Sequence, residues 1–252
     1  MSSDRGSAKL EADHHPDAIS ERLAEDTRHS YLGDAVLGGI DGCVTTFAVV
    51  AGVAGGGLSA GVAIILGFAN LLADGFSMAV SNYQGTKSQR ELVSKVRRME
   101  EHHIRHVPDG EREEIRQIFA AKGFEGEVLE KVVSTITSDR KLWVDTMLTE
   151  EHGLQLDTPN PLRAALVTFA AFCMVGLVPL LPYLLPGLPV RLTFPVSAAA
   201  TAVAFFLIGL AKGRYLEHAM LRGGLETLFL GGGAAALAYG VGAWLQATFG
   251  IA

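Results

Sequence analysis

Charge is missing from four long stretches of this sequence. No lysine, arginine, aspartate or glutamate occurs in residues 42–73, 164–190, 192–211 or 227–252. Each stretch is about as long as the roughly 20 apolar residues that cross a bilayer as a helix. Most of the charge falls instead in residues 83–157. This division excludes a uniformly apolar globule and predicts a membrane protein with one polar insert.

Three further absences narrow the class of protein. The only two cysteines, Cys43 and Cys173, both lie in apolar stretches, which argues against a disulfide scaffold. Basic charge is not in excess, since the net charge is −6, and nucleic acid is therefore not an expected partner. The polar leader, residues 1–30, lacks the basic-then-apolar pattern of a cleaved signal. We expect the first span to remain as an anchor, and the leader to contain a helix at about residues 18–26.

The apolar stretches predict an all-α membrane protein with five transmembrane helices, at residues 31–54, 59–83, 162–184, 192–211 and 225–248. Gly55, Gly56 and Gly57 are expected to form the first turn, since glycine accepts positive φ. Basic residues gather in the insert and in the 212–222 loop. With five spans, the positive-inside rule places both of these and the leader in the cytoplasm. The expected divisions are a leader (1–30), spans one and two (31–83), a cytoplasmic helical metal-binding domain (84–158) and spans three to five (159–252).

The insert between spans two and three reads as four helices. The first, residues 84–105, is expected to continue the second span without a break. The others are expected at residues 111–121, 124–137 and 139–152. Asp109 is the candidate N-cap of the second helix, and Gly123 its C-terminal cap.

Acidic and sulfur-containing side chains border the first charge-free stretch. Asp34 and Asp41 are seven residues apart on the first span, with glycines between them that allow a second helix to approach closely. Asn70, Asp74 and Met78 are spaced by four on the second span. A carboxylate in the hydrocarbon zone costs about 2.5–3.5 kcal/mol and therefore usually has a function. If the two stripes face each other, they form an oxygen-and-sulfur path for a divalent cation.

Some of these side chains have simpler interpretations. Asp34 could cap the first span at the interface, and Met78 alone is more often a packing residue. Glu226, at the start of the fifth span, is either interfacial or part of the polar core.

The insert carries three pairs of possible metal ligands, each on one helix face: Glu100 with His103, Glu111 with Glu114, and Met147 with Glu151. Carboxylates with an imidazole suit Fe²⁺, Mn²⁺ and Zn²⁺, and a thioether favours softer ions. Acidic pairs at this spacing are also common on solvated helices, so spacing alone leaves the metal site open.

Taken together, these motifs resemble the vacuolar iron transporter family. The segments that carry the resemblance are residues 34–42, 73–78, 82–83, 86–88, 143–147, 151–154 and 212–214, with Pro108, Glu111 and Glu114. The resemblance implies a homodimer with five spans per chain that exports Fe²⁺, and often Mn²⁺, from the cytosol in exchange for protons. It implies that Asp41 and Met78 are ligands in the membrane. It also implies that the insert's ligands are Glu100, His103, Glu111, Glu114, Met147 and Glu151.

The sequence departs from the family pattern at several of these positions. Asn70 stands where a glutamate is usual, and Asp74, one turn away, is a candidate replacement for its charge. His103 stands where a second glutamate is usual, and Leu148 where a second methionine is common. The preference between iron and manganese is therefore open.

Two other function classes deserve comparison with a transporter. A di-iron carboxylate oxidase uses a Glu-x-x-His motif on each of two helices. Residues 100–103 supply one such motif, but Glu111 and Glu114 do not supply a second. A membrane-anchored metal sensor would leave Asp41 and Asp74 unexplained. We therefore expect a transporter and not an enzyme, in a bacterial plasma membrane or, alternatively, a vacuolar membrane.

Overall fold

The computed structural model describes residues 14–24, 30–215 and 220–250. The chain divides into two compact units, Met1–Ser30 and Tyr31–Ala252. In the first unit, α2 spans Pro16–Ala24. Its helix overlaps the one expected at residues 18–26, of which the last two residues lie outside the described part of the chain.

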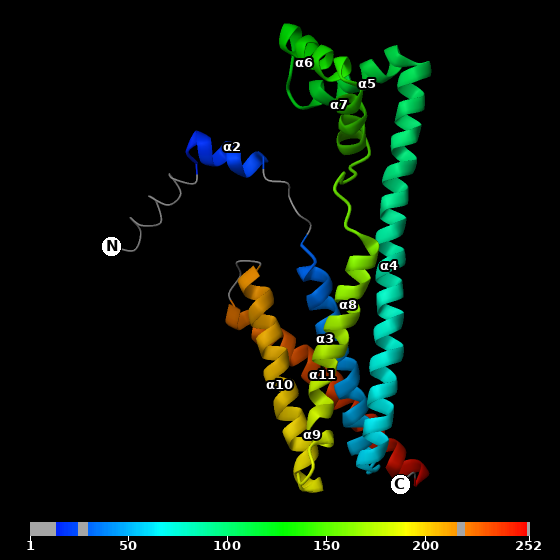
Figure 1. Cartoon of the computed structure of the whole chain (residues 1–252), viewed down its shortest axis with the longest axis vertical. Helices are drawn as coiled ribbons and strands as arrows, with labels where there is room; N and C mark the ends of the chain where they lie inside the picture. Colours follow the sequence, from blue (N-terminus) through cyan, green and yellow to red (C-terminus); the bar gives the residue numbers. More distant parts are fainter. Residues whose placement is uncertain (1–13, 25–29, 216–219, 251–252) are drawn as a thin grey trace, which may run out of the picture. The chain divides into compact units, whose positions relative to one another are not determined.

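The described part of the second unit is helical (Figure 1). Its elements are α3 (Leu32–Gly55), α4 (Ala60–His106), α5 (Pro108–Ala121), α6 (Gly126–Ser138), α7 (Arg140–Thr146), the π-helix η1 (Met147–Glu151), α8 (Pro161–Gly176), the 3₁₀-helix η2 (Val178–Leu180), α9 (Leu181–Leu184), α10 (Val190–Tyr215) and α11 (Met220–Phe249).

Five stretches of the described chain are long and apolar enough to cross a membrane: Leu32–Gly55, part of Ala60–His106, Pro161–Leu184, Val190–Ala211 and Met220–Phe249. The insertion α5–η1 lies between the second and third of them. The predicted fold class, five spans with a helical insert, is therefore confirmed. The expected 212–222 loop is shorter than predicted, because α10 continues to Tyr215 and α11 begins at Met220.

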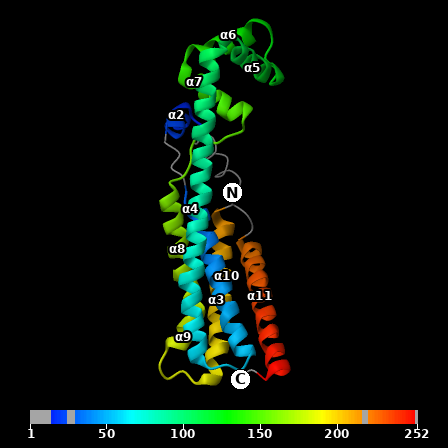
Figure 2. The same cartoon turned by 90° about the vertical axis from the view of Figure 1, so that its right-hand side faces the viewer.

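The first span, α3, packs against all the other long apolar helices, α4, α8, α10 and α11 (Figure 2). Glycine makes the closest of these contacts possible. A Cβ on Gly38 would lie 2.3 Å from the carbonyl oxygen of Thr168, and one on Gly42 equally close to that of Phe172. No larger residue fits there, so α3 and α8 are held backbone to backbone, as the glycines between Asp34 and Asp41 predicted.

The second span and the first helix of the insert form one continuous helix, as predicted. α4 runs through 47 residues (Figure 1). Its membrane half buries small residues and Leu71 against α8. Its other half buries Val93, Val96, Glu100 and Ile104, which are three or four residues apart and therefore share one face. α4 thus serves both the membrane bundle and the insert.

The insert has a hydrophobic core of its own. Its buried apolar members come from α4, α5, α6, α7 and η1: Val93, Val96, Ile104, Ile115, Val133, Ile136, Trp143, Val144, Met147 and Leu148. Ion pairs connect neighbouring helices around this core. Arg97 on α4 pairs with Asp145 on α7 at 2.6 Å, and Lys122 pairs with Glu150 on η1. The helices that carry the candidate ligands are therefore fixed relative to one another.

The structure corrects three details of the prediction. Asp109 is not an N-cap, because α5 already begins at Pro108, a residue suited to the first helical position since its missing N–H has no partner to lose there. The helix expected at residues 139–152 changes at Met147 into the π-helix η1. The third span is not one α-helix, because Pro179 lacks the N–H that would continue α8.

Candidate metal centres

Two groups of possible metal ligands meet in the insert, and Glu100 belongs to both. In the first, Glu100 and His103 of α4 lie with Glu111 of α5. His103 Nδ1 is 3.3 Å from Glu111 Oε1. In the second, Glu100 lies with Glu151 and His152. Within each group the ligand atoms are all within 4.8 Å of one another, which is a spacing that one cation can bridge.

The two central carboxylates are buried and incompletely paired. Glu100 is 1% exposed and Glu111 is 4% exposed. One oxygen of each, Oε2, has no hydrogen-bond partner among the described residues. A buried carboxylate without compensation is costly, and coordination of a metal is one of the usual remedies. The donor set of carboxylates and imidazoles fits Fe²⁺, Mn²⁺ or Zn²⁺.

The electrostatics of the site also favour a cation. Burial raises the pKa of Glu111 to about 8, and repulsion from Glu114, Glu100 and Glu151 adds to the shift. Burial likewise raises the pKa of Glu151, with Glu100 and Glu114 again repelling it. A divalent ion would replace these bound protons and cancel the repulsion.

The raised pKa of Glu111 predicts that the metal-free insert becomes less stable as pH rises. The ordinary pKa of this carboxyl is 4.5, and in the folded protein it is about 8. Between these values the folded state holds a proton that the unfolded chain has lost, so stability falls with increasing pH over that interval. Buried Trp143 offers a fluorescence signal in the insert for a thermal melt. We expect a lower melting temperature at pH 8.5 than at pH 6, and a larger stabilisation by Mn²⁺ at pH 8.5.

Glu111→Gln provides the control for this pH dependence, because the amide does not titrate. In that variant the melting temperature should change less between pH 6 and pH 8.5. An equally steep decline would show that other groups cause it.

The π-helix η1 brings His152 into the site. Its five-residue turn lets the backbone N–H of His152 donate to the carbonyl of Met147 at 3.3 Å. The His152 ring then lies with Nε2 3.0 Å from Glu100 Oε1 and 3.5 Å from Glu151 Oε2. The sequence analysis missed His152. Its position beside Glu151, within the segment 151–154 that carries the family resemblance, was a signal for it, but nothing in the sequence marks the π-turn that directs it inward.

The other two predicted ligands of the insert, Glu114 and Met147, belong to neither ligand group. Glu114 is exposed on α5 and reaches Glu111 and Glu151 through its charge. Met147 is fully buried in the apolar core of the insert. The structure therefore brings Glu100 together with His103 and Glu111 in one group and with Glu151 in the other, whereas Glu114 and Met147 belong to neither.

In the membrane bundle, the Asp34 side chain accepts a hydrogen bond from Asn82, which was not among the predicted path residues. Asn82 of α4 donates from Nδ2 to Asp34 Oδ1 and to Thr168 Oγ1, at 2.7 Å in each case. This cluster joins α3, α4 and α8. Asn82 continues the spacing of Asn70, Asp74 and Met78 by another four residues, and that regularity would have found it.

Asp41, Asn70 and Met78 are half-buried, whereas Asp74 is exposed on the surface of the single chain. Asn70 Nδ2 donates to Thr45 Oγ1 at 3.2 Å, and Thr45 donates to the backbone carbonyl of Asp41 at 2.9 Å. Asp74 lies within electrostatic range of Asp41. Of the second predicted stripe, Asn70 thus contacts α3 through Thr45, a residue outside the first stripe and four residues after Asp41, and Asp74 is exposed one turn along α4.

Comparison with known proteins places these features in a family. The model of the VIT family matches residues 32–243. A vacuolar iron transporter of Toxoplasma gondii is 32% identical over 233 residues, covering 89% of this chain and 77% of the relative. Vacuolar iron transporter 1 of Arabidopsis thaliana is 31% identical over 215 residues, covering 84% and 85%. A vacuolar iron transporter of Plasmodium berghei is 27% identical over 246 residues, covering 94% and 89%. With the match extending from the first span into the fifth, this chain belongs to the VIT family.

Proposed function

We propose that this protein transports Fe²⁺, and also Mn²⁺, out of the cytosol across a membrane in exchange for protons. The observation that carries the proposal is the placement of acidic residues on one continuous helix at two levels. α4 bears Glu100 in the insert and Asp74 in its apolar half. Iron as the cargo is supported by the relatives, which are named vacuolar iron transporters.

In this proposal the insert collects the ion from the cytosol. Its ligands are the predicted set Glu100, His103, Glu111, Glu114, Met147 and Glu151, to which the geometry adds His152. The unpartnered oxygens of Glu100 and Glu111 support this role, because they are buried acceptors that a cation would satisfy. Zn²⁺ would fit the same donors.

The path across the membrane is assigned to Asp41, Asp74 and Met78, with Asp34 and Asn70 beside them. The exposure of Asp74 supports a homodimer, since a second copy packed on this face of α4 would enclose the carboxylate. Leaving it toward lipid would cost about 2.5–3.5 kcal/mol.

Proton exchange follows from the chemistry of the ligands. A carboxylate that binds a proton cannot offer the same oxygen to a metal, so the two cations compete. Metal from the cytosol would displace protons, and protons from the more acidic outer side would release the metal. The direction is argued from the positive-inside rule, which counts Lys and Arg residues: most of them lie in the insert, so the insert is expected on the cytoplasmic side.

The test is metal uptake into proteoliposomes under an imposed pH gradient, with Fe²⁺ and Mn²⁺ in separate runs. Uptake that follows the gradient supports the exchanger and ranks the two ions. No uptake of either ion by folded protein would favour the membrane-anchored sensor, in which only the insert functions. The oxidase alternative is set aside by membership of a family whose named relatives are transporters.

We propose the bacterial plasma membrane as the location, with the vacuolar membrane as the alternative that the relatives' names support. Membrane fractionation with an antibody against the insert distinguishes the two.

His152→Gln is expected to change which metal the insert prefers. It removes the imidazole that lies 3.0 Å from Glu100, and imidazole suits Fe²⁺ and Zn²⁺ better than it suits Mn²⁺. We expect Fe²⁺ and Zn²⁺ affinity to fall about tenfold and Mn²⁺ affinity to fall less, as measured by calorimetry on the purified protein. His102→Gln is the matched control, since His102 is an exposed histidine on α4 that belongs to neither ligand group. Unchanged affinity for all three metals would contradict a ligand role, and equal losses for all three would contradict the change of preference.

A further inference from the structure

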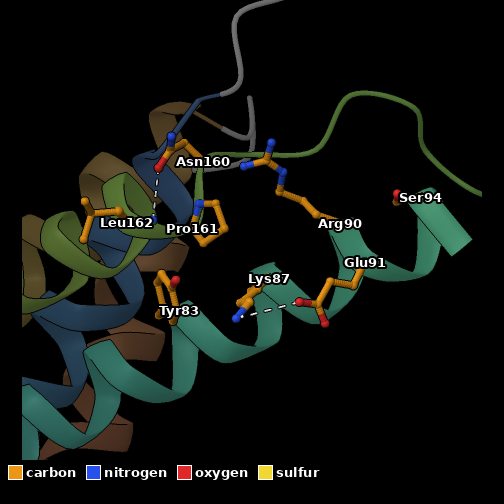
Figure 3. A pocket seen from close by; sticks show the side chains of 8 residues that line it. All are labelled: Tyr83, Lys87, Arg90, Glu91, Ser94, Asn160, Pro161 and Leu162. Carbon is orange, nitrogen blue, oxygen red and sulfur yellow. Dashed lines mark hydrogen bonds and ion pairs between the residues drawn. The ribbon is translucent and has the colours of Figure 1, made fainter.

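A cavity of about 460 Å³ lies between α4 and the start of α8, outside the metal site (Figure 3). Its lining is Tyr83, Lys87, Arg90, Glu91, Ser94, Asn160, Pro161 and Leu162. Figure 3 shows the Arg90 side chain extending from α4 on the side of the hollow toward Asn160. The cavity is therefore bounded by the two helices at the point where both meet the polar insert.

The cavity carries unneutralised positive charge. Among the described residues, Arg90 has no ion pair or hydrogen bond to protein. Lys87 Nζ lies 3.7 Å from Glu91 Oε1, which is a long distance for an ion pair, and both side chains are exposed. Such pairs are weak, so Lys87 remains available to an anion. Two cations and one carboxylate leave the lining with net positive charge.

A second cavity, of about 350 Å³, adjoins the first and is wholly apolar. Its lining is Phe76, Ala79, Val80 and Tyr83 from α4, with Leu162, Ala165, Leu166 and Phe169 from α8. These positions are three and four residues apart on both helices, so they form a groove along the helix pair. Tyr83 and Leu162 line both cavities. The polar hollow therefore continues into the apolar groove.

The two cavities match the two levels of a bilayer leaflet. Lys87 is the first charged residue of α4 after Asp74, and the apolar groove lies on the span side of it. Tyr83 stands between them, at the depth where aromatic side chains commonly anchor a helix to the membrane surface. The polar cavity is at the headgroup level and the groove at the level of acyl chains.

We propose that this composite cavity binds an anionic phospholipid. The phosphate lies between Lys87 and Arg90, and one acyl chain fills the groove between α4 and α8. The phosphate is contacted by side chains and not by the backbone amides at the start of α8, because the amides of Leu162 and Arg163 already donate to Asn160 Oδ1. The net positive lining selects an anionic headgroup, such as phosphatidylglycerol, over a zwitterionic one.

The bound lipid would act as a bridge between α4 and α8. Deeper in the membrane those helices pack directly through Gly75 against Phe169 and Phe172, and Asn82 donates to Thr168 at 2.7 Å. A phospholipid in the groove would extend their contact to the membrane surface, next to the Asn82 cluster.

The test is native mass spectrometry of the full-length protein, titrated separately with phosphatidylglycerol and phosphatidylethanolamine in detergent. Lys87→Gln/Arg90→Gln should lose about tenfold in affinity for phosphatidylglycerol. Lys95→Gln/Lys131→Gln removes the same charge from exposed positions outside the cavity and should keep wild-type affinity. Leu166→Gln places an amide in the groove and should weaken binding while leaving Lys87 and Arg90 intact.

Three outcomes would overturn the proposal. Equal binding by the wild type and Lys87→Gln/Arg90→Gln would remove the phosphate site. Equal binding of the two lipids by the wild type would remove the anionic selectivity. Displacement of bound phosphatidylglycerol by millimolar inorganic phosphate, with no effect of Leu166→Gln, would show a free-phosphate site without an acyl groove. Far-ultraviolet circular dichroism of each variant confirms that it is folded before any of these comparisons is made.

Discussion

Asp41→Ala should reduce gradient-driven uptake of Fe²⁺ and Mn²⁺ to the level of empty liposomes. Asp41 is a half-buried carboxylate at the edge of the longest charge-free stretch, within electrostatic range of Asp74. In the described structure it is the backbone carbonyl of Asp41 that accepts the hydrogen bond from Thr45. Removing the carboxylate therefore leaves that hydrogen bond in place, while it removes the central charge of the proposed path.

The measurement is proteoliposome uptake with a matched control. Asp109→Ala removes a carboxylate of the same kind from an exposed position on α5, and it should transport as the wild type does. Size-exclusion chromatography should give the same oligomer for all three proteins. Uptake by folded Asp41→Ala at the wild-type rate would exclude Asp41 from the path.

Glu100→Gln should weaken metal binding by the insert at least about 100-fold, since it replaces a carboxylate shared by both ligand groups. The amide is nearly the same size, so packing around this buried position is preserved. The effect on transport should be different. Uptake should decline at low metal concentration and recover at high concentration, because Asp41, Asp74 and Met78 are untouched.

Calorimetry and uptake over a range of metal concentrations separate these two effects. Glu101→Gln is the neighbouring control, a change of the same kind at a residue that is in neither ligand group. Unchanged metal affinity in Glu100→Gln would rule out the insert site. Loss of uptake even at saturating metal would mean that the insert is part of the path itself.

The sequence predicted the elements of the fold well because the relevant signals are local. Absence of charge over a span's length marks a transmembrane helix wherever it occurs. The continuity of α4 was predictable because helix-forming residues follow the second span with no proline or glycine pair. Asp109 as an N-cap was wrong because the proline before it, Pro108, was a better first residue for the helix.

The candidate metal site was only partly predictable, because it depends on tertiary structure. Helical spacing selected Glu100, Glu111 and Glu151, which belong to the two groups of possible ligands that the structure brings together. It did not find His152, since the π-turn after Met147 changes which residues share a face. Met147 and Leu148, at the start of that turn, are buried in the core of the insert, a tertiary environment that no local pattern specifies.

In the membrane, the missing information was which face of α4 packs inward. Ala63, Gly67, Gly75 and Ala79 are buried, and this row of small residues could have predicted the face that contacts α8. The stripe of Asn70, Asp74 and Met78 then lies beside that face. Within this stripe, Asn70 donates a hydrogen bond to Thr45 of α3, and Met78 packs against the hydrophobic core of the bundle.

Because α4 is one continuous helix, it fixes the distance between the two proposed binding sites of the ion, one in the membrane and one in the insert. Met78 and Glu100 are 22 residues apart on one helix, which at 1.5 Å per residue separates them by about 33 Å. No change of side-chain rotamer bridges that gap. Under the proposed function, an ion released by the insert has to cross this distance before it reaches the ligands in the membrane. The insert would then act as a local reservoir that raises the metal concentration near the bundle, and we expect its benefit to be greatest when the metal is scarce.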